Sequence, residues 1–301
     1  MNRFLKVSCI IAAAAFFTFC KRDDDGTSTP PPRDYTEQYA TEKVDIENYI
    51  STHYIENVTP ELDITFKKID SSGSQISIKD QQQYPLQSKL VTFEGVEYTV
   101  YYLVLREGVG KAPTRADNII AAYRGTFLDN IQFENNPFPQ TPSSLALAVR
   151  GWQEIIPLFR EGVYNDIPNN PDPASYSNYG AGVMFLPSAL AYYNRPPASS
   201  NPVIPSYATM IFSFKLYRAD DVDSDLDGIV NRFETVPGTD IADYDTDGDG
   251  IPNYADTDDD GDGFLTKDEI NGATVNSEDS FNLLATCSGG TLKIHLDPAC
   301  N

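Results

Sequence analysis

The feature that most constrains this 301-residue chain is an acidic block in its C-terminal third. Between Asp220 and Glu269 there are eighteen Asp or Glu residues and two Lys or Arg residues, a net charge of −16 out of −22 for the whole chain. So many carboxylates in one short segment repel one another unless cations neutralise them. No basic patch elsewhere could bind a phosphate backbone, so no nucleic-acid partner is expected.

Three segments of the block follow the pattern of a calcium-binding loop, in which alternating oxygen ligands precede a glycine and a closing carboxylate. The glycines are Gly228, Gly250 and Gly263. The candidate calcium ligands are Asp223, Asp225, Asp227, Glu234, Asp245, Asp247, Asp249, Asn253, Asp256, Asp258, Asp260, Asp262 and Glu269. The last two loops lie close together, and Gly250-Ile251-Pro252-Asn253 resembles thrombospondin type 3 repeats more than EF-hands. Little helix-forming sequence separates the loops. We expect calcium to stiffen a spacer, with no part in chemistry; a solvated acidic linker is the alternative.

The first twenty residues indicate export. Arg3 and Lys6 precede an apolar run over residues 10–19, which is shorter than the ~20 residues of a transmembrane helix. The run ends at Cys20, and this order resembles a bacterial lipoprotein signal. The resemblance implies an acylated Cys20, the lipid bilayer as a partner, and an outer-membrane lipoprotein of the cell envelope exposed at the surface. An ordinary cleaved signal is the alternative.

The composition changes along the chain and so divides it. Residues 21–34 read as a charged and proline-rich linker. A helix is predicted over residues 41–55, capped by Thr41, because one face carries the apolar residues Val44, Ile46, Tyr49, Ile50 and Tyr54. The predicted segments are a signal (1–20), a linker (21–34), a helix and strands packing on the main domain (35–90), the main domain (91–218), the acidic repeats (219–272) and a tail (273–301).

Within the main domain the apolar period is close to two, which is typical of strands. Runs over residues 90–93 and 98–105 flank Glu94-Gly95, a hairpin turn. Further strands are predicted over 118–128, 183–186 and 209–217, and a short helix over 151–160. The predicted class is α+β: an antiparallel sheet wrapped around a short central helix, followed by the calcium-loop extension.

Four ordered blocks in this domain resemble the FKBP-type peptidyl-prolyl cis–trans isomerases. They are Ala122-Tyr123-Arg124-Gly125-Thr126 with Gln132-Phe133-Glu134, then Val149-Arg150-Gly151-Trp152, then Leu186-Pro187 to Tyr192, and Val203-Ile204-Pro205 leading to Phe212. The resemblance covers residues 97–218 and implies an isomerase that acts on proline-containing polypeptides. It implies a pocket formed by Tyr123, Phe133, Glu134, Val149, Trp152, Tyr192, Ile204 and Phe212.

The resemblance also implies roles for these residues. Trp152 would form the floor beneath the prolyl ring, while the Val149 N–H and the Tyr192 hydroxyl would bind substrate carbonyls. Glu134 stands where the family usually has Asp, and Tyr193 where it commonly has Gly. Two other functions remain open: a non-catalytic FKBP-fold binding or chaperone module, and a calcium-stiffened structural protein of the surface.

The tail contains the last two cysteines. Cys287 and Cys300 could form one disulfide in an oxidising compartment, or remain two free thiols. Residues 291–296 alternate polar and apolar side chains, which predicts a small terminal strand.

Overall fold

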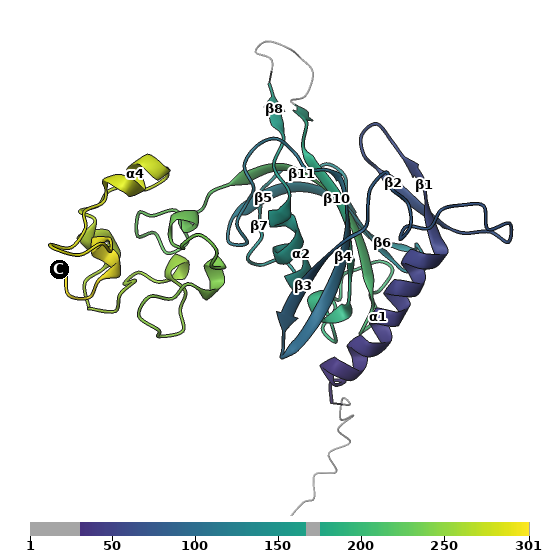
Figure 1. Cartoon of the computed structure of the whole chain (residues 1–301), viewed down its shortest axis with the longest axis horizontal. Helices are drawn as coiled ribbons and strands as arrows, with labels where there is room; N and C mark the ends of the chain where they lie inside the picture. Colours follow the sequence, from purple (N-terminus) through teal and green to yellow (C-terminus); the bar gives the residue numbers. More distant parts are fainter. Residues whose placement is uncertain (1–30, 167–174, 301) are drawn as a thin grey trace, which may run out of the picture. The chain divides into compact units, whose positions relative to one another are not determined.

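An antiparallel sheet forms the centre of the structure, a computed structural model that describes residues 31–166 and 175–300. Its strand order is β3-β4-β10-β11-β5-β6, and β7 pairs with β5 (Figure 1). The predicted α+β class with an antiparallel sheet is confirmed. The predicted signal and Cys20 lie outside the described residues. The strands are β3 (Gln87–Phe93), β4 (Val96–Arg106), β5 (Asn118–Phe127), β6 (Gln132–Asn136), β7 (Ser143–Ser144), β10 (Gly180–Leu186) and β11 (Met210–Asp220).

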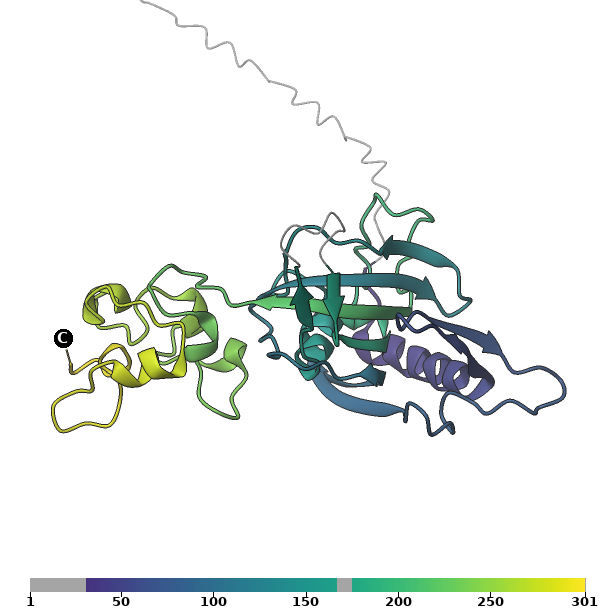
Figure 2. The ribbon, with the colours of Figure 1, turned by 90° about the horizontal axis from the view of Figure 1, so that it is seen from above.

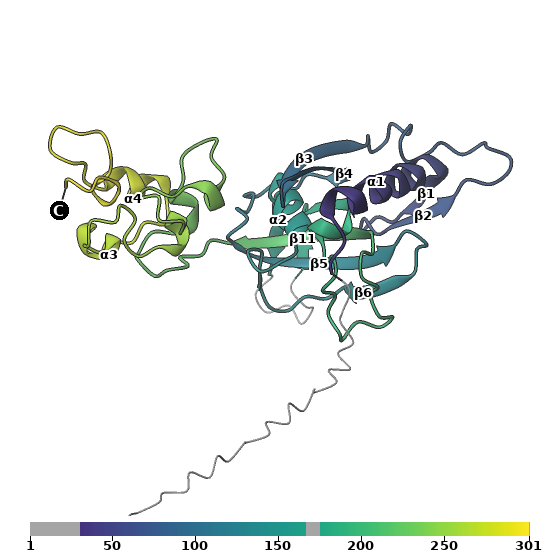
Figure 3. The ribbon, with the colours of Figure 1, turned by 90° about the horizontal axis from the view of Figure 1, so that it is seen from below.

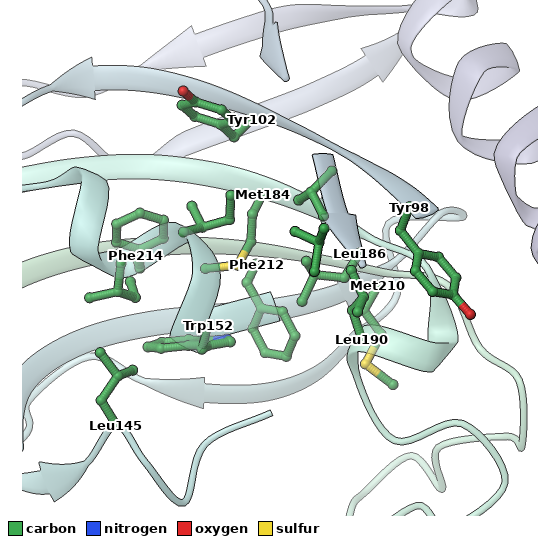
Figure 4. Close-up of a cluster of buried hydrophobic side chains, with 14 of the residues drawn as sticks. Tyr98, Tyr102, Leu145, Trp152, Met184, Leu186, Leu190, Met210, Phe212 and Phe214 are labelled. Carbon is green, nitrogen blue, oxygen red and sulfur yellow. The ribbon is translucent and has the colours of Figure 1, made fainter. Parts of the chain in front are cut away.

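One face of the sheet packs against the short helix α2 (Arg150–Ile155), which continues as the 3₁₀ turn η1 (Ile156–Leu158). Side chains alternate between the two faces of a strand, so Phe212 and Phe214 of β11 point towards α2. Figure 4 shows these rings around Trp152. The buried apolar cluster on this face includes residues from β4, β5, β10, β11 and α2. The predicted short central helix is therefore present.

A second core covers the other face of the sheet, at one end. It is made by α1 (Tyr35–Thr52) and the hairpin of β1 (His53–Val58) and β2 (Ile64–Lys68), which Figures 2 and 3 show lying together. Ile46 and Ile50 of α1 contact the strand residues of this cluster. Both residues are at most 2% exposed, so the helix covers this end of the face completely.

The first helix begins earlier than the sequence predicts. The side chain of Asp34, rather than that of Thr41, caps it by accepting hydrogen bonds from the N–H groups of Thr36 and Glu37. Val44, expected on the apolar face, is 63% exposed. Asp34 is the stronger cap because its carboxylate reaches two of the free N–H groups in the first turn.

The loops and the tail match the sequence predictions only in part. The predicted hairpin turn at Glu94-Gly95 is confirmed, with both residues at positive φ, 48° and 74°. The predicted strand over 291–296 is wrong: β-pairing there is limited to an isolated bridge between Thr286 and Lys293, and η6 (Ile294–Leu296) is a 3₁₀ turn. A small hairpin of β8 (Val163–Asn165) and β9 (Ser175–Ser177) was not predicted.

The acidic region has short helices instead of strands. They are η3 (Asn231–Phe233), η4 (Ile241–Asp243), η5 (Asn253–Ala255) and α3 (Thr266–Glu269), and α4 (Glu278–Leu283) follows in the tail. A small apolar cluster around Ile229, Ile270 and Val275 joins the acidic loops to the tail. Cys287 and Cys300 form a disulfide with a Cα–Cα distance of 5.6 Å. Within residues 31–166 and 175–300, the helices are too short or too polar to cross a bilayer.

Candidate functional site

The aromatic residues singled out from the sequence come together on the α2 face of the sheet. The Trp152 ring lies 5.2 Å from Tyr123 and 5.6 Å from Phe212, both edge-to-face. Phe133 meets Phe212 at 5.6 Å, also edge-to-face. Such pairs stabilise one another by about 0.5–1.5 kcal/mol beyond the burial of their area. The predicted residues Val149, Tyr192 and Ile204 belong to the same cluster.

Glycine is required in β5 for these rings to approach. A Cβ atom built on Gly125 would lie 2.5 Å from the Phe133 ring and 3.0 Å from the Phe212 ring. Any side chain at this position would push the two rings apart. The short block Tyr123-Arg124-Gly125 therefore fixes one wall of the cluster through its backbone.

Glu134 is placed at the rim of the cluster by β6, which pairs with β5. The Tyr123 hydroxyl donates a hydrogen bond to its carboxylate at 2.6 Å. Burial raises the pKa of Tyr123, and this hydrogen bond to Glu134 raises it further. The extra methylene of Glu relative to Asp does not prevent the contact. The phenol is therefore neutral at any physiological pH and remains a donor.

Two groups expected to bind substrate carbonyls have free hydrogen-bonding capacity. Val149 is the residue before α2, and its carbonyl accepts from the N–H of Trp152 at 2.9 Å. Within the described part of the chain, neither the Val149 N–H nor the Tyr192 hydroxyl has a hydrogen-bond partner. Burial raises the pKa of Tyr192, with a smaller contribution from the Glu134 carboxylate. Both groups can therefore donate to a ligand.

The segment that carries Tyr192 is held by the N-terminal helix. Tyr193 has a φ of 48°, a conformation that favours glycine. This agrees with the glycine that the resemblance implies at this position. The Tyr193 ring stacks on Tyr35 at 4.3 Å, and its hydroxyl donates to the Arg33 carbonyl at 2.5 Å. Nearby, the buried carboxylate of Glu42 accepts from the Ser188 N–H at 3.0 Å. These contacts offset the backbone strain at Tyr193.

A separate cavity of about 950 Å³ lies on the face of the sheet away from α2. Its floor includes Arg124 of β5 and Lys215 of β11, and the β8–β9 hairpin borders it. Lys215 forms an ion pair with Asp63 at 2.7 Å, so this charge is already neutralised. Of the predicted pocket residues it touches only Tyr123. The aromatic cluster and this cavity are therefore different features.

The three acidic loops share one internal geometry. In each loop the first aspartate (Asp223, Asp245 or Asp258) accepts a hydrogen bond from the N–H of the glycine five residues later, at 2.9–3.1 Å. All three glycines have positive φ, from 95° to 107°. The carboxylates at positions one, three and five of each loop come within 4.8 Å of one another. This is the arrangement that the sequence pattern predicts for a cation site.

The chemistry of these donors fits calcium. Buried carboxylate oxygens without a hydrogen-bond partner occur in the first and third loops, on Asp225, Asp227, Glu234, Asp258, Asp260 and Glu269. Burial, together with the neighbouring carboxylates of Asp225 and Asp227, raises the pKa of Glu234 to about 11. The same causes, with Asp260 and Asp262 as neighbours, raise the pKa of Glu269 to about 7. A hard divalent cation with oxygen ligands would remove both penalties.

One predicted ligand is placed differently and one acidic residue was missed. Asn253 accepts from the Thr246 N–H and donates to the Thr246 hydroxyl, both at 2.9 Å, so it braces its loop from within. Asn231 makes the equivalent pair of bonds with Ser224 in the first loop. Asp259, which the loop pattern does not include, is 1% exposed and lies beside Glu234. The run of three aspartates at 258–260 was the only sequence signal for it.

A family model and several curated relatives each match part of this chain. A family model described as "BamM C-terminal" matches residues 217–294, which contain the acidic loops and most of the tail. The probable FKBP-type peptidyl-prolyl cis-trans isomerase FkpA of Neisseria meningitidis is 27% identical over 130 residues, which make up 42% of this chain and 40% of that protein. The corresponding FkpA of Escherichia coli K12 is 26% identical over 117 residues, or 38% and 36%.

The chain thus spans well under two thirds of the length of the curated relatives it matches. Among solved structures, FkpA from Escherichia coli matches with a TM-score of 0.31 and 23% identity, over 44% of this chain and 51% of that one. A peptidyl-prolyl isomerase from Pseudomonas syringae pv. tomato matches with a TM-score of 0.35 and 13% identity, over 62% and 97%. The similarity to FKBP-type isomerases therefore rests on the sequence matches.

Proposed function

We propose that this chain is a peptidyl-prolyl cis–trans isomerase that acts on proline-containing polypeptides. The observation that carries the proposal is the convergence of Tyr123, Phe133, Trp152 and Phe212 on one face of the sheet, with Glu134 bonded to Tyr123. The sequence similarity to FkpA-type isomerases supports it. None of these residues needs to act as a nucleophile.

The physical basis is the electronic structure of the X–Pro bond. Rotation of a peptide bond faces a barrier of ~18–20 kcal/mol because resonance gives the C–N bond double-bond character. The twisted amide has lost this resonance, and its carbonyl is less polar than that of the planar form. An aromatic, water-poor surface around Trp152 would therefore favour the twisted state over the planar, well-hydrated one. The free donors at Val149 and Tyr192 would hold the flanking carbonyls.

The test is the rate of cis–trans isomerisation of a short X–Pro peptide with the full chain and two variants. Trp152→Leu removes the aromatic floor and keeps an apolar side chain; we expect kcat/KM to fall at least about tenfold, which is ~1.4 kcal/mol. Tyr164→Phe is the control, because Tyr164 is exposed in β8 and lies outside the aromatic cluster. A wild-type protein that folds without accelerating isomerisation would leave only a binding role for the cluster.

We also propose that the acidic loops bind calcium as structural ions and that the protein works in the cell envelope, assisting the folding of exported proteins. The unpartnered buried carboxylates of Glu234 and Glu269 support the first part. The signal-like N-terminal run, Cys20 at its end as an acylation site and the Cys287–Cys300 disulfide support the second. Radiolabelled palmitate on the wild type but not on Cys20→Ser would test the anchor.

A further inference from the structure

A carboxylate from the third acidic loop lies among those of the first loop. One oxygen of Asp259 comes within 4.8 Å of an oxygen of Asp227 and of Glu234. All three residues are at most 2% exposed. Asp259 is 25 residues beyond Glu234 in the chain, so this proximity depends on how the extension folds.

These buried charges lack hydrogen-bond partners. Both carboxylate oxygens of Glu234 and both of Asp259 have none, and neither does one oxygen of Asp227. The Thr266 hydroxyl accepts from the Asp259 N–H at 3.1 Å and lies near its carboxylate, but not in hydrogen-bonding geometry. The positive charge of the exposed Lys267 attracts the Asp227 carboxylate from outside this group of three carboxylates. Removing a carboxylate from water without a partner costs several kcal/mol per ion.

Asp259 belongs to the third loop, but it does not stand at one of the ligand positions of that loop. The second position of the other loops is Ser224 or Thr246, whose hydroxyl pairs with the asparagine seven residues later. In the third loop Thr266 takes the place of that asparagine and bonds to the Asp259 backbone. The side chain of Asp259 is thereby left for another partner. Its carboxylate lies in one group with those of Asp227 and Glu234 of the first loop.

We propose that Asp227, Glu234 and Asp259 share one divalent cation of the calcium type, which ties the first loop to the third. The proposal rests on the calcium binding proposed above and adds a ligand from outside the loop pattern. Ligands on opposite sides of a calcium ion lie up to about 5 Å apart, since calcium–oxygen distances are about 2.3–2.6 Å. The spacing of these oxygens, all within 4.8 Å, suits that ion. The cation would therefore link the first loop directly to the third.

The first test is calcium binding by the full chain, measured by equilibrium dialysis with elemental analysis. We expect Asp259→Asn to weaken one site at least about tenfold, an effect of ~1.4 kcal/mol. The matched control is Asp268→Asn, which removes the same charge from an exposed position in the same loop. A double-mutant cycle with Glu234→Gln should show strong coupling, because the second substitution then acts on a site already lost.

The second test measures the distance between the first and third loops instead of the calcium affinity. Spin labels at Leu226→Cys and Phe264→Cys, which are 72% and 53% exposed, report the distance between the two loops. Calcium should narrow the distance distribution in the labelled parent and with Asp268→Asn, but not with Asp259→Asn. Calcium binding and narrowing that are unchanged by Asp259→Asn would overturn the proposal. A parent that binds no calcium would instead overturn the proposed function of the loops.

Discussion

The sheet domain and the acidic extension reach a folded state by different physics. The domain buries apolar residues on both faces of its sheet, including Tyr98, Leu103, Phe159 and Phe185, each of which is fully buried. The extension has only a small apolar cluster around Ile229 and buries carboxylates in its place. Apolar burial is favourable in plain water, whereas buried carboxylates are favourable only with a counter-charge.

Within one chain, the stability of one region can therefore depend on a bound ion while that of another region does not. The domain is held mainly by its own apolar side chains, and its buried Asp117 also pairs with Arg232 of the extension. The extension has unpartnered buried oxygens on Asp227, Glu234 and Glu269, and the calcium ions proposed above would neutralise them. The family model that matches the extension covers residues 217–294 and so begins within β11.

Removal of calcium should have the largest effect, and it should be confined to the extension. With excess chelator, amide protons over residues 223–269 should lose protection until exchange is close to that of an unfolded chain, because local opening then costs about 0 kcal/mol. Protection in β10 and β11 should stay unchanged. Hydrogen exchange followed by mass spectrometry measures both regions in one sample. Equal loss of protection in the two regions would contradict the comparison.

A substitution in the second core of the domain should have the next largest effect. Ile50→Ala should lower the free energy of unfolding by about 2–5 kcal/mol, because it opens a cavity between α1 and the sheet. The matched control, Val44→Ala on the exposed side of the same helix, should change it by about 0.5 kcal/mol or less. Urea unfolding followed by the Trp152 fluorescence measures both. Similar losses for the two variants would show that α1 is not part of the core.

The pH dependence of the extension should reverse with calcium. Burial and neighbouring carboxylates raise the pKa of Glu234 to about 11 and that of Glu269 to about 7, against ordinary values of 4.5. Without calcium the folded state therefore binds more protons than the unfolded state between these values, and stability should rise as pH falls from 8 to 5. With saturating calcium, protons compete with the ion, so acidification should destabilise. Hydrogen exchange over residues 223–269 at several pH values, corrected for the intrinsic exchange rate, measures the sign with calcium and with chelator.

Tyr193→Phe should have the smallest effect. It removes the hydrogen bond to the Arg33 carbonyl and keeps the stacking on Tyr35, so the free energy of unfolding should fall by about 0.5–1.5 kcal/mol. The change should appear in the domain alone and leave calcium binding untouched. Differential scanning calorimetry with and without chelator distinguishes the regions. A loss of calcium affinity in this variant would argue that the two regions are coupled.

The sequence predicted features that depend on near neighbours or on a family pattern. The Glu94-Gly95 turn and the strands of the sheet follow from local chemistry, and the aromatic cluster follows from ordered blocks. The Asp34 cap was missed because Thr41 also fits the cap rule, and only packing of the preceding turn decides between them. Asp259 was missed because its partners come from another loop. Contacts set by tertiary folding leave no periodic signal in one sequence.

The most direct test of the account is the isomerisation rate of an X–Pro peptide by the full chain, measured before and after calcium removal. The account predicts acceleration over the uncatalysed time of ~10–100 s at 25 °C in both conditions, with rates equal within about twofold. The aromatic cluster around Trp152 lies in the sheet domain, which contains none of the proposed calcium ligands. No acceleration in either condition, or acceleration that disappears with calcium, would contradict it.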